Sequence, residues 1–174
     1  MKILLISDIH SNIVALNTVL EDAGPVDAVW CLGDLVGYGP EPDACVTRIR
    51  ELPNLLCIQG NHDAAVSSLR NIERFNDDAE KAILITRSII SPQSVDFLQA
   101  LPETIETEAA LLVHGSPRNP IWEYILDSLT AKMAFAYAKK DFIFVGHTHM
   151  PIGFFHENKT DKMTKKLFKD GESK

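Results

Sequence analysis

Residues 3–10 read ILLISDIH, an apolar run that ends in an aspartate and a histidine. The same arrangement returns at 28–34, AVWCLGD, and at 55–62, LLCIQGNH. Short apolar runs of this kind are typical of buried strands. Stretches of helical character at 12–22 and 41–52 separate the three runs, and the second has a proline at its start, where a helix tolerates one. This part of the chain therefore predicts a β-α-β-α-β unit.

Two further apolar runs, at 110–113 and 142–145, predict strands in the second half of the chain. Residues 64–101 have the spacing of helices, and another helix is expected at 129–139. Strands and helices in this order predict a layered, mixed α/β fold. With 174 residues, of which 45% are apolar, the chain has the size of one domain with a buried core.

The formal net charge of -7 argues against broad electrostatic binding of nucleic acid or of an anionic membrane. It does not exclude small phosphates, because carboxylates that bind metal ions contribute to the negative charge and the bound cations would reverse the local field. We therefore expect no membrane partner and no nucleic-acid polymer. A small anionic substrate stays compatible with the composition.

The cysteine pattern and the N-terminus favour the cytoplasm. Cys31, Cys45 and Cys57 lack the close pairing of a zinc knuckle, which suits a reducing compartment. The first apolar run breaks at Asp8, too early for the core of a signal peptide, and no later run approaches membrane-spanning length.

Side chains that can bind metal ions follow every one of the five apolar runs. In α/β sheets the carboxyl ends of the strands form the rim where ligands bind, so residues distant in sequence would meet there. A single histidine in such a position is as readily structural as functional. Five of the six histidines occur there, however, together with two aspartates and an asparagine, and this favours one shared site. These candidates are Asp8, His10, Asp34, Asn61, His62, His114, His147 and His149.

The motifs at these positions resemble those of the calcineurin-like metallophosphoesterase family. Within that family, GDLVGYGP and HGSP resemble the small prokaryotic phosphodiesterase branch, which is also called diadenosine tetraphosphatase-like. The resemblance implies an α/β/β/α sandwich of mixed sheets flanked by helices. In chain order the motifs are DIH at 8–10, GDLVGYG at 33–39, GNHD at 60–63, HG at 114–115 and GHTH at 146–149.

The resemblance also implies a site for two divalent metal ions. One ion would be bound by Asp8, His10 and His149, and the other by Asn61, His114 and His147. Asp34 would bridge the two. This mixed nitrogen and oxygen set suits manganese, which we expect, and also iron, zinc, nickel or cobalt.

The reaction implied is hydrolysis of a small phosphate ester, most readily a phosphodiester, by a hydroxide shared between the two metals. His62 would stabilise or protonate the leaving oxygen, and Asp63 would orient the His62 ring. Asn61 and Arg118 would contact the substrate, the latter because a guanidinium suits bidentate contact with phosphate.

Two departures from the family pattern refine these expectations. The second motif has Gly37 and Tyr38 where protein-dephosphorylating members have an acidic residue and an arginine, which weakens a protein-phosphatase interpretation. After GHTH the chain reads PIGFFHENK instead of an NPGS loop and further strands. We therefore expect a domain over 1–157 that lacks the C-terminal strands, followed by a basic, exposed tail over 158–174. Either the chain is a shortened form, another chain completes the sheet, or an exposed strand edge remains, and a homodimer is therefore an expectation.

Two other functions fit the same fold. The family includes a retromer subunit that acts as a scaffold and lacks part of the catalytic set, but here His62 and all seven ligand positions are present. A nuclease of the same superfamily is disfavoured by the acidic charge and by the lack of interleaved basic and aromatic residues.

Overall fold

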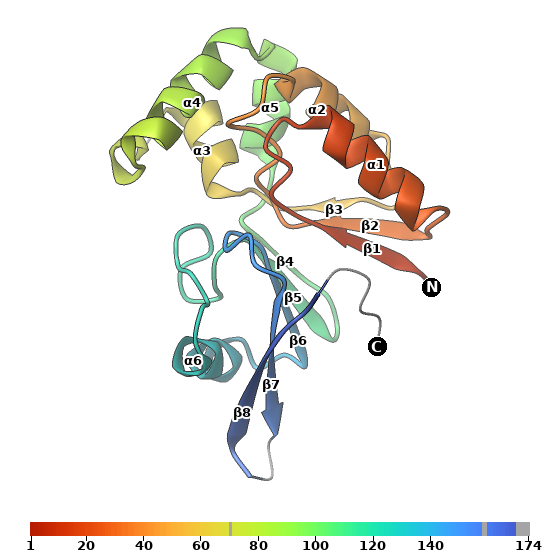
Figure 1. Ribbon diagram of the computed structural model, residues 1–174, viewed down its shortest axis with the longest axis vertical. Coiled ribbons are helices and arrows are strands. Elements are labelled where there is room, and N and C mark those ends of the chain that lie inside the picture. The colour runs from red at the N-terminus through yellow and green to blue at the C-terminus, as the bar shows by residue number, and fades with distance from the viewer. Residues whose placement is uncertain (70, 158–159, 170–174) are drawn as a thin grey trace.

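The computed structural model describes residues 1–69, 71–157 and 160–169. Its first sheet is parallel, with the strand order β1-β2-β3, and α1 and α2 connect its strands (Figure 1). The predicted β-α-β-α-β unit is therefore confirmed. The side chain of Asn12 accepts a hydrogen bond from the Ala15 amide at 3.0 Å, which caps α1 at its first turn. The elements are β1 (Ile3–Ile6), α1 (Ile13–Ala23), β2 (Ala28–Cys31), α2 (Pro42–Arg50) and β3 (Leu56–Cys57).

Four helical elements follow the first sheet where residues 64–101 were expected to be helical. With α1 and α2, the longer ones lie on one side of that sheet, as Figure 1 shows, and a buried apolar cluster that includes Leu35, Val66 and Leu98 lies beneath them. The first helix starts at Asn61, so His62 and Asp63 lie in a helical turn instead of a loop. The elements are α3 (Asn61–Ser68), the 3₁₀ helix η1 (Ile72–Arg74), α4 (Asp77–Ile89) and α5 (Pro92–Ala100).

The second sheet is mixed, because β4 pairs antiparallel with β5 while β5 pairs parallel with β6. It packs against the first sheet through a cluster that includes Leu32, Ile58 and Leu112. The layered α/β prediction is confirmed. This half of the chain consists of β4 (Thr104–Glu106), β5 (Ala110–Val113), α6 (Ser128–Ala138) and β6 (Phe142–Val145).

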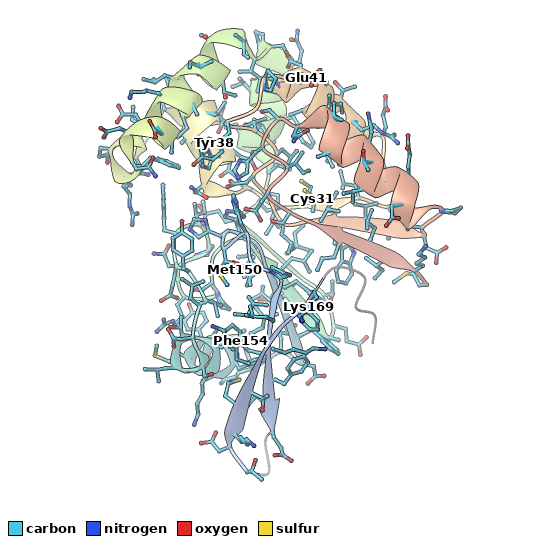
Figure 2. The ribbon with its side chains drawn as sticks, viewed as in Figure 1. Cys31, Tyr38, Glu41, Met150, Phe154 and Lys169 are labelled. Carbon is cyan, nitrogen blue, oxygen red and sulfur yellow. The ribbon has the colours of Figure 1, made fainter. Side chains whose placement is uncertain are left out.

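A hairpin that the sequence analysis did not predict follows the second sheet. Its strands β7 (Ile152–Glu157) and β8 (Lys162–Leu167) are antiparallel, with Ile152 opposite Leu167. The predicted boundary at 157 coincides with the last residue of β7, and β8 lies within the expected tail. Phe154, which Figure 2 labels, and Met163 explain the difference, because both pack against the cluster that includes Ala131 and Ala134 of α6. The parts of that tail at 158–159 and 170–174 lie outside the described residues.

Within the described ranges, no helix combines the length and the apolar composition that crossing a bilayer requires.

Candidate metal centre

Hydrogen bonds between the first two strands continue into the loops that follow them. The amides of Asp8, His10 and Ser11 donate to the carbonyls of Gly33, Asp34 and Leu35 at 3.0, 3.0 and 2.9 Å. The two loops are therefore joined as regularly as the strands before them. These three hydrogen bonds fix the backbone that carries Asp8, His10 and Asp34, the first three predicted metal ligands.

Five of the seven predicted ligands adopt positive φ angles. These conformations are uncommon for residues other than glycine and cost about 1–3 kcal/mol each, so they persist only where the surrounding structure imposes them. Five such residues lie at one place, which indicates a site where the backbone conformation sets the direction of the ligand side chains. The residues and angles are Asp8 55°, His10 49°, Asp34 53°, His147 65° and His149 53°.

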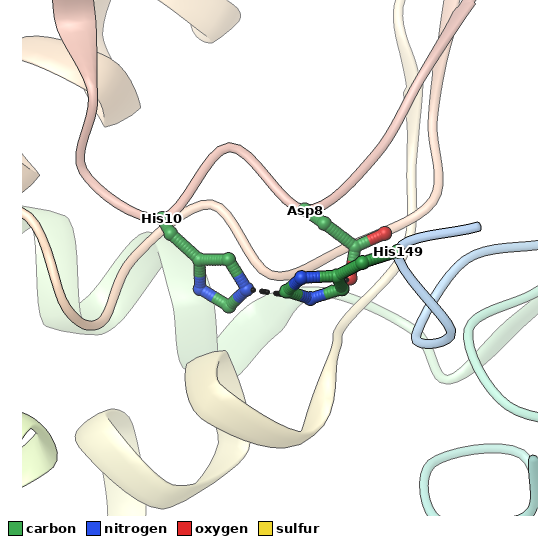
Figure 3. Close-up of side chains that lie close together, drawn as sticks. All are labelled: Asp8, His10 and His149. Atoms are coloured by element: carbon green, nitrogen blue, oxygen red, sulfur yellow. Dashed lines mark hydrogen bonds and ion pairs between the residues drawn. The ribbon is translucent and has the colours of Figure 1, made fainter. Parts of the chain in front are cut away.

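Asp8, His10 and His149 form the first group of ligand atoms (Figure 3). The Nε2 atoms of the two histidines are 3.1 Å apart, and His149 Nε2 lies 3.3 Å from Asp8 Oδ1. His10 Nδ1 is 3.1 Å from the Val36 carbonyl, which can only accept, so Nδ1 carries the proton. The lone pair of neutral His10 therefore lies on Nε2 and points at His149.

His114 is the centre of the second group. Its Nδ1 donates to the Leu32 carbonyl at 2.7 Å, and its Nε2 lies 3.0 Å from Asn61 Oδ1 and 3.3 Å from Asp34 Oδ2. In the neutral ring, Nε2 would present a lone pair to two oxygen acceptors, which requires either a proton or a cation between them. Burial lowers the pKa of His114, but the Asp34 carboxylate outweighs it and raises the pKa to about 9. The oxygen atoms around His114 Nε2 therefore favour a positive charge at this position, as they would at a metal site.

The ring of His147 completes this second group and stacks on Tyr124, with ring centroids 3.8 Å apart. Its Nε2 is buried and has no hydrogen-bond partner among the described residues. A buried nitrogen without a partner is costly, whereas coordination to a metal ion would satisfy it.

Asp34 lies between the two groups. Its Oδ2 is 3.3 Å from His114 Nε2 and 3.8 Å from His10 Nε2, while its Oδ1 accepts from the His62 amide at 2.9 Å. Burial alone would raise the pKa of this carboxyl, yet the charge and hydrogen bond of His114 bring the pKa well below its usual value. Asp34 is therefore ionised at neutral pH, as a bridging ligand must be.

Two glycines leave the space that these side chains occupy. A Cβ atom on Gly60 would collide with the Asp34 carboxylate. Gly37 has a φ of 95°, and a Cβ atom there would lie 2.5 Å from His62 Nδ1. Any other residue at either position would displace the group it touches.

His62 is buried beside the ligands, and its buried Nδ1 has no hydrogen-bond partner in the part of the chain that is described. Its ring packs against Tyr38 and Phe75 at centroid distances of 4.7 and 5.0 Å. Burial lowers the pKa of His62 to about 4.

Asp63 does not orient the His62 ring by a direct hydrogen bond, which corrects the predicted role. Its carboxylate accepts from the Gly60 amide at 3.0 Å and from the Val36 amide at 3.2 Å. The reason is its place in the first turn of α3, where a side chain folds back on the amide that precedes the helix. Asp63 instead joins the loops of the second and third motifs, and burial raises its pKa to about 7.

A cavity of about 510 Å³ opens over the ligand groups. Trp122 and Tyr124 line it, and Arg74 and Phe75 of the η1 region line it as well. No sequence pattern pointed to Arg74, which lies in a stretch with ordinary helical spacing. The other lining residues are Asp34, Tyr38, Asn61, His62, Asn76, Ala79, His147, Thr148 and His149.

Arg118, predicted to contact substrate, is not among the residues that line this cavity. Its guanidinium instead forms a two-point ion pair with Glu123, in which the Nε–Oε2 distance is 3.1 Å. The turn at 116–119 makes this pairing local, because the Ser116 hydroxyl also donates to Glu123. The structure therefore does not place Arg118 at the site.

Comparison with known proteins identifies the family. The model of the calcineurin-like phosphoesterase superfamily domain matches residues 1–168. The chain belongs to the calcineurin-like phosphoesterase superfamily. The predicted family is thereby confirmed, and membership supports a metal-dependent hydrolase role in general.

Members of this superfamily align over most of the chain. Protein MJ0912 of Methanocaldococcus jannaschii is 41% identical over 157 residues, which cover 86% of this chain and 63% of that protein. The crystal structure of a Sphaerobacter thermophilus metallophosphoesterase matches with a TM-score of 0.85 and 39% identity, covering 99% of this chain and 70% of that one. The chain thus spans less than two thirds of the length of its curated relative.

A crystal structure of a candidate diadenosine tetraphosphatase matches with a TM-score of 0.55 and 19% identity, covering 95% of this chain and 64% of that one. At this identity the match supports the calcineurin-like phosphoesterase fold alone.

Proposed function

We propose that this chain is a phosphoesterase that uses two divalent metal ions to hydrolyse a small phosphate ester, most readily a phosphodiester. The observation that carries the proposal is the position of Asp34 between two groups of ligand atoms, with its Oδ2 3.8 Å from His10 Nε2 and 3.3 Å from His114 Nε2, at a cavity that Asp34 itself lines. Two metals that share one carboxylate are a recurrent arrangement for displacement at phosphorus.

The donor set fits two such ions. Asp8, His10 and His149 would hold one, and Asn61, His114 and His147 the other, with Asp34 common to both. Nitrogen and oxygen donors in this mixture suit manganese, and also iron, zinc, cobalt or nickel. When bound, the ions would supply Lewis acidity and charge neutralisation for the phosphate.

The chain's own residues would position the ester and assist the departure of its leaving group. His62 lines the cavity next to Asn61, and its Nδ1 has no hydrogen-bond partner among the described residues, so the ring can donate a hydrogen bond to the leaving oxygen. Tyr38 and Phe75 fix the ring from two sides. Asp63 would maintain this arrangement through Gly60 and Val36.

A cytoplasmic location forms part of this proposal. It is supported by the three free, buried thiols of Cys31, Cys45 and Cys57, which suit a reducing compartment.

The test is manganese-dependent hydrolysis of bis-p-nitrophenyl phosphate. Wild-type protein should turn over this diester. Asp34→Asn should abolish turnover together with the binding of at least one metal, whereas His62→Ala should keep both metals and lower kcat by about 10²–10⁴-fold. His156→Ala is the matched control, because His156 pairs with Asp161 in the hairpin. A folded protein that binds two metals and hydrolyses no phosphate ester would refute the proposal and favour a scaffold.

A further inference from the structure

The cavity extends beyond the predicted metal ligands along a series of ring contacts. The His62 ring meets Phe75 at a centroid distance of 5.0 Å, and Phe75 meets Trp122 at 5.1 Å. The guanidinium carbon of Arg74 lies 4.4 Å from the centroid of the Trp122 ring. All four residues line the same cavity. The positively charged guanidinium of Arg74 therefore lies in the wall of the cavity, connected to His62 through the rings of Phe75 and Trp122.

The charge of Arg74 is not neutralised by a neighbouring carboxylate. Within the described part of the chain, no Asp or Glu lies within ion-pair distance of it, although Glu73 precedes it directly. Asp78, in the next helix, lies near Lys81 instead, at 3.8 Å. Arg118 shows the contrasting arrangement. Its guanidinium forms an ion pair with Glu123 and does not line the cavity.

The guanidinium of Arg74 lies over the Trp122 ring, which offers it no hydrogen-bond acceptor. A cation over an indole ring is stabilised by about 0.5–1 kcal/mol at an exposed site. A contact with the face of an aromatic ring restricts the position of the guanidinium without using its N–H donors. The planar fork of these donors binds the oxygens of phosphate in a bidentate manner.

Arg74 is also the one lysine or arginine among the described residues that line the cavity. The phosphate at the predicted metal centre would be neutralised by the metals, and the guanidinium of Arg74, which stays protonated, cannot be one of their ligands. Its charge is therefore available to a different anionic group. A cavity of about 510 Å³ falls in the range of pockets that hold a whole small ligand, beyond a single phosphate.

We propose that Arg74, held in place by Trp122, binds a second phosphate group of the substrate, separate from the ester phosphate that is hydrolysed. This assigns Arg74 a specificity-determining role and defines the substrate class as small esters with two phosphate groups. The inference rests on the proposed function for the position of the first phosphate.

The experiment compares two ligands that differ only in a distal phosphate. Thymidine 5′-monophosphate and thymidine 3′,5′-bisphosphate are titrated into the manganese-loaded protein by calorimetry. The wild-type protein should bind the bisphosphate about tenfold or more tightly than the monophosphate, as expected for a charge-assisted hydrogen bond. Arg74→Gln should remove this preference and leave the affinity for the monophosphate within about twofold, and Arg74→Lys should restore part of it.

Two further variants separate the role of Arg74 from unspecific effects. Arg118→Gln removes the same charge outside the cavity and should keep the full preference for the bisphosphate. Trp122→Leu should lower the preference, because it releases the guanidinium. Equal binding of the two ligands by the wild-type protein, or a preference that survives in Arg74→Gln, would overturn the inference.

The p-nitrophenyl esters of the same two nucleotides give a second readout, in which the reacting bond is identical. The preference of kcat/KM for the 3′-phosphorylated ester should follow the calorimetric one. Failure of the proposed function would appear as the absence of hydrolysis of both esters, whereas failure of this inference would appear as equal hydrolysis of both.

Discussion

The Nε2 atoms of His10 and His149 lie 3.1 Å apart, although 139 positions separate the two residues in the chain. Since His10 Nδ1 is engaged by the Val36 carbonyl, two imidazole nitrogens and an Asp8 oxygen meet with too few protons to satisfy them all. A divalent cation resolves that conflict, and this gives the first prediction.

Removal of His149 should weaken the binding of one manganese ion by more than the ~10–100-fold that is typical for partners outside the coordination shell. His10→Ala should have a similar effect. The double variant should lose less than the product of the two single effects, because both side chains serve one ion. Calorimetric titration with manganese measures this, and Asp96→Asn on the exposed side of α5 is the control. Independent, multiplicative losses would contradict a shared ion.

Gly60→Ala should disturb metal binding as well as stability. The added methyl group would collide with the Asp34 carboxylate, and a clash in a packed interior costs about 1–3 kcal/mol. Gly24→Ala is the matched control, because its φ of 62° makes it destabilising too while no heavy atom lies within 4 Å of the new Cβ. Urea unfolding should show losses in both variants, and manganese titration a loss in Gly60→Ala alone. Normal titration of Gly60→Ala would show that the Asp34 position is less constrained than the structure indicates.

Asp43 should make stability depend on pH. It joins α2 to α5 by accepting from the Ser91 amide at 3.1 Å and the Ser91 and Ser94 hydroxyls at 2.6 and 2.5 Å. Partial burial raises the pKa of Asp43, but these hydrogen bonds outweigh it and bring the pKa below 3.8. Because the folded-state pKa is lowered, the stabilisation is present above about pH 4 and is lost as the pH falls through the folded value.

Asp43→Asn should therefore lower the free energy of unfolding by about 1 kcal/mol at pH 7, a modest value because the carboxylate is partly solvated. The difference from wild type should shrink toward pH 3. Urea denaturation at the two pH values measures it, with Asp22→Asn on α1 as the control. A difference that is constant between pH 7 and pH 3 would exclude the ionised carboxylate as its cause.

The protein should self-associate through β6. This strand ends the second sheet within the described part of the chain, and Phe142 on it is 57% exposed and stacks on Phe144. Unpaired strand edges with apolar side chains favour pairing with another chain. Light scattering should show a concentration-dependent dimer, and Phe142→Glu should shift the protein toward the monomer. A wild-type protein that stays monomeric at all concentrations would refute the expectation of a homodimer.

The strands and the convergence of the predicted ligands could be read from the sequence, because both depend on local patterns. Apolar runs of four or five residues predicted the strands, and the ligands at their ends predicted a shared site. The structure brings Asp34 and His114 together although they follow strands of different sheets. The positions of Arg118 and Arg74 were not predicted, because they depend on contacts between residues in the folded structure. The charge of Arg118 is neutralised by Glu123, whereas Arg74 enters the cavity because η1 turns it toward Trp122.

The role of Asp63 and the strand β8 were missed for a related reason. Asp63 was expected to act on its neighbour in the motif, but the helical start at Asn61 directs its carboxylate to Gly60 and Val36. The lysine-rich composition of 162–167 suggested a solvated tail. Pairing with β7 and the packing of Met163 depend on residues distant in sequence, which composition alone does not show.

Backbone hydrogen bonds connect the loops after β1 and β2, so the amides of these metal-binding segments are paired as they would be in a sheet. Amide protons in loops normally exchange with solvent far faster than those in strands. Those of Asp8, His10 and Ser11 should exchange as slowly as their neighbours in β1, even without metal. A site protected in this way needs little ordering when an ion enters, so metal capture should leave the exchange rates of this segment almost unchanged.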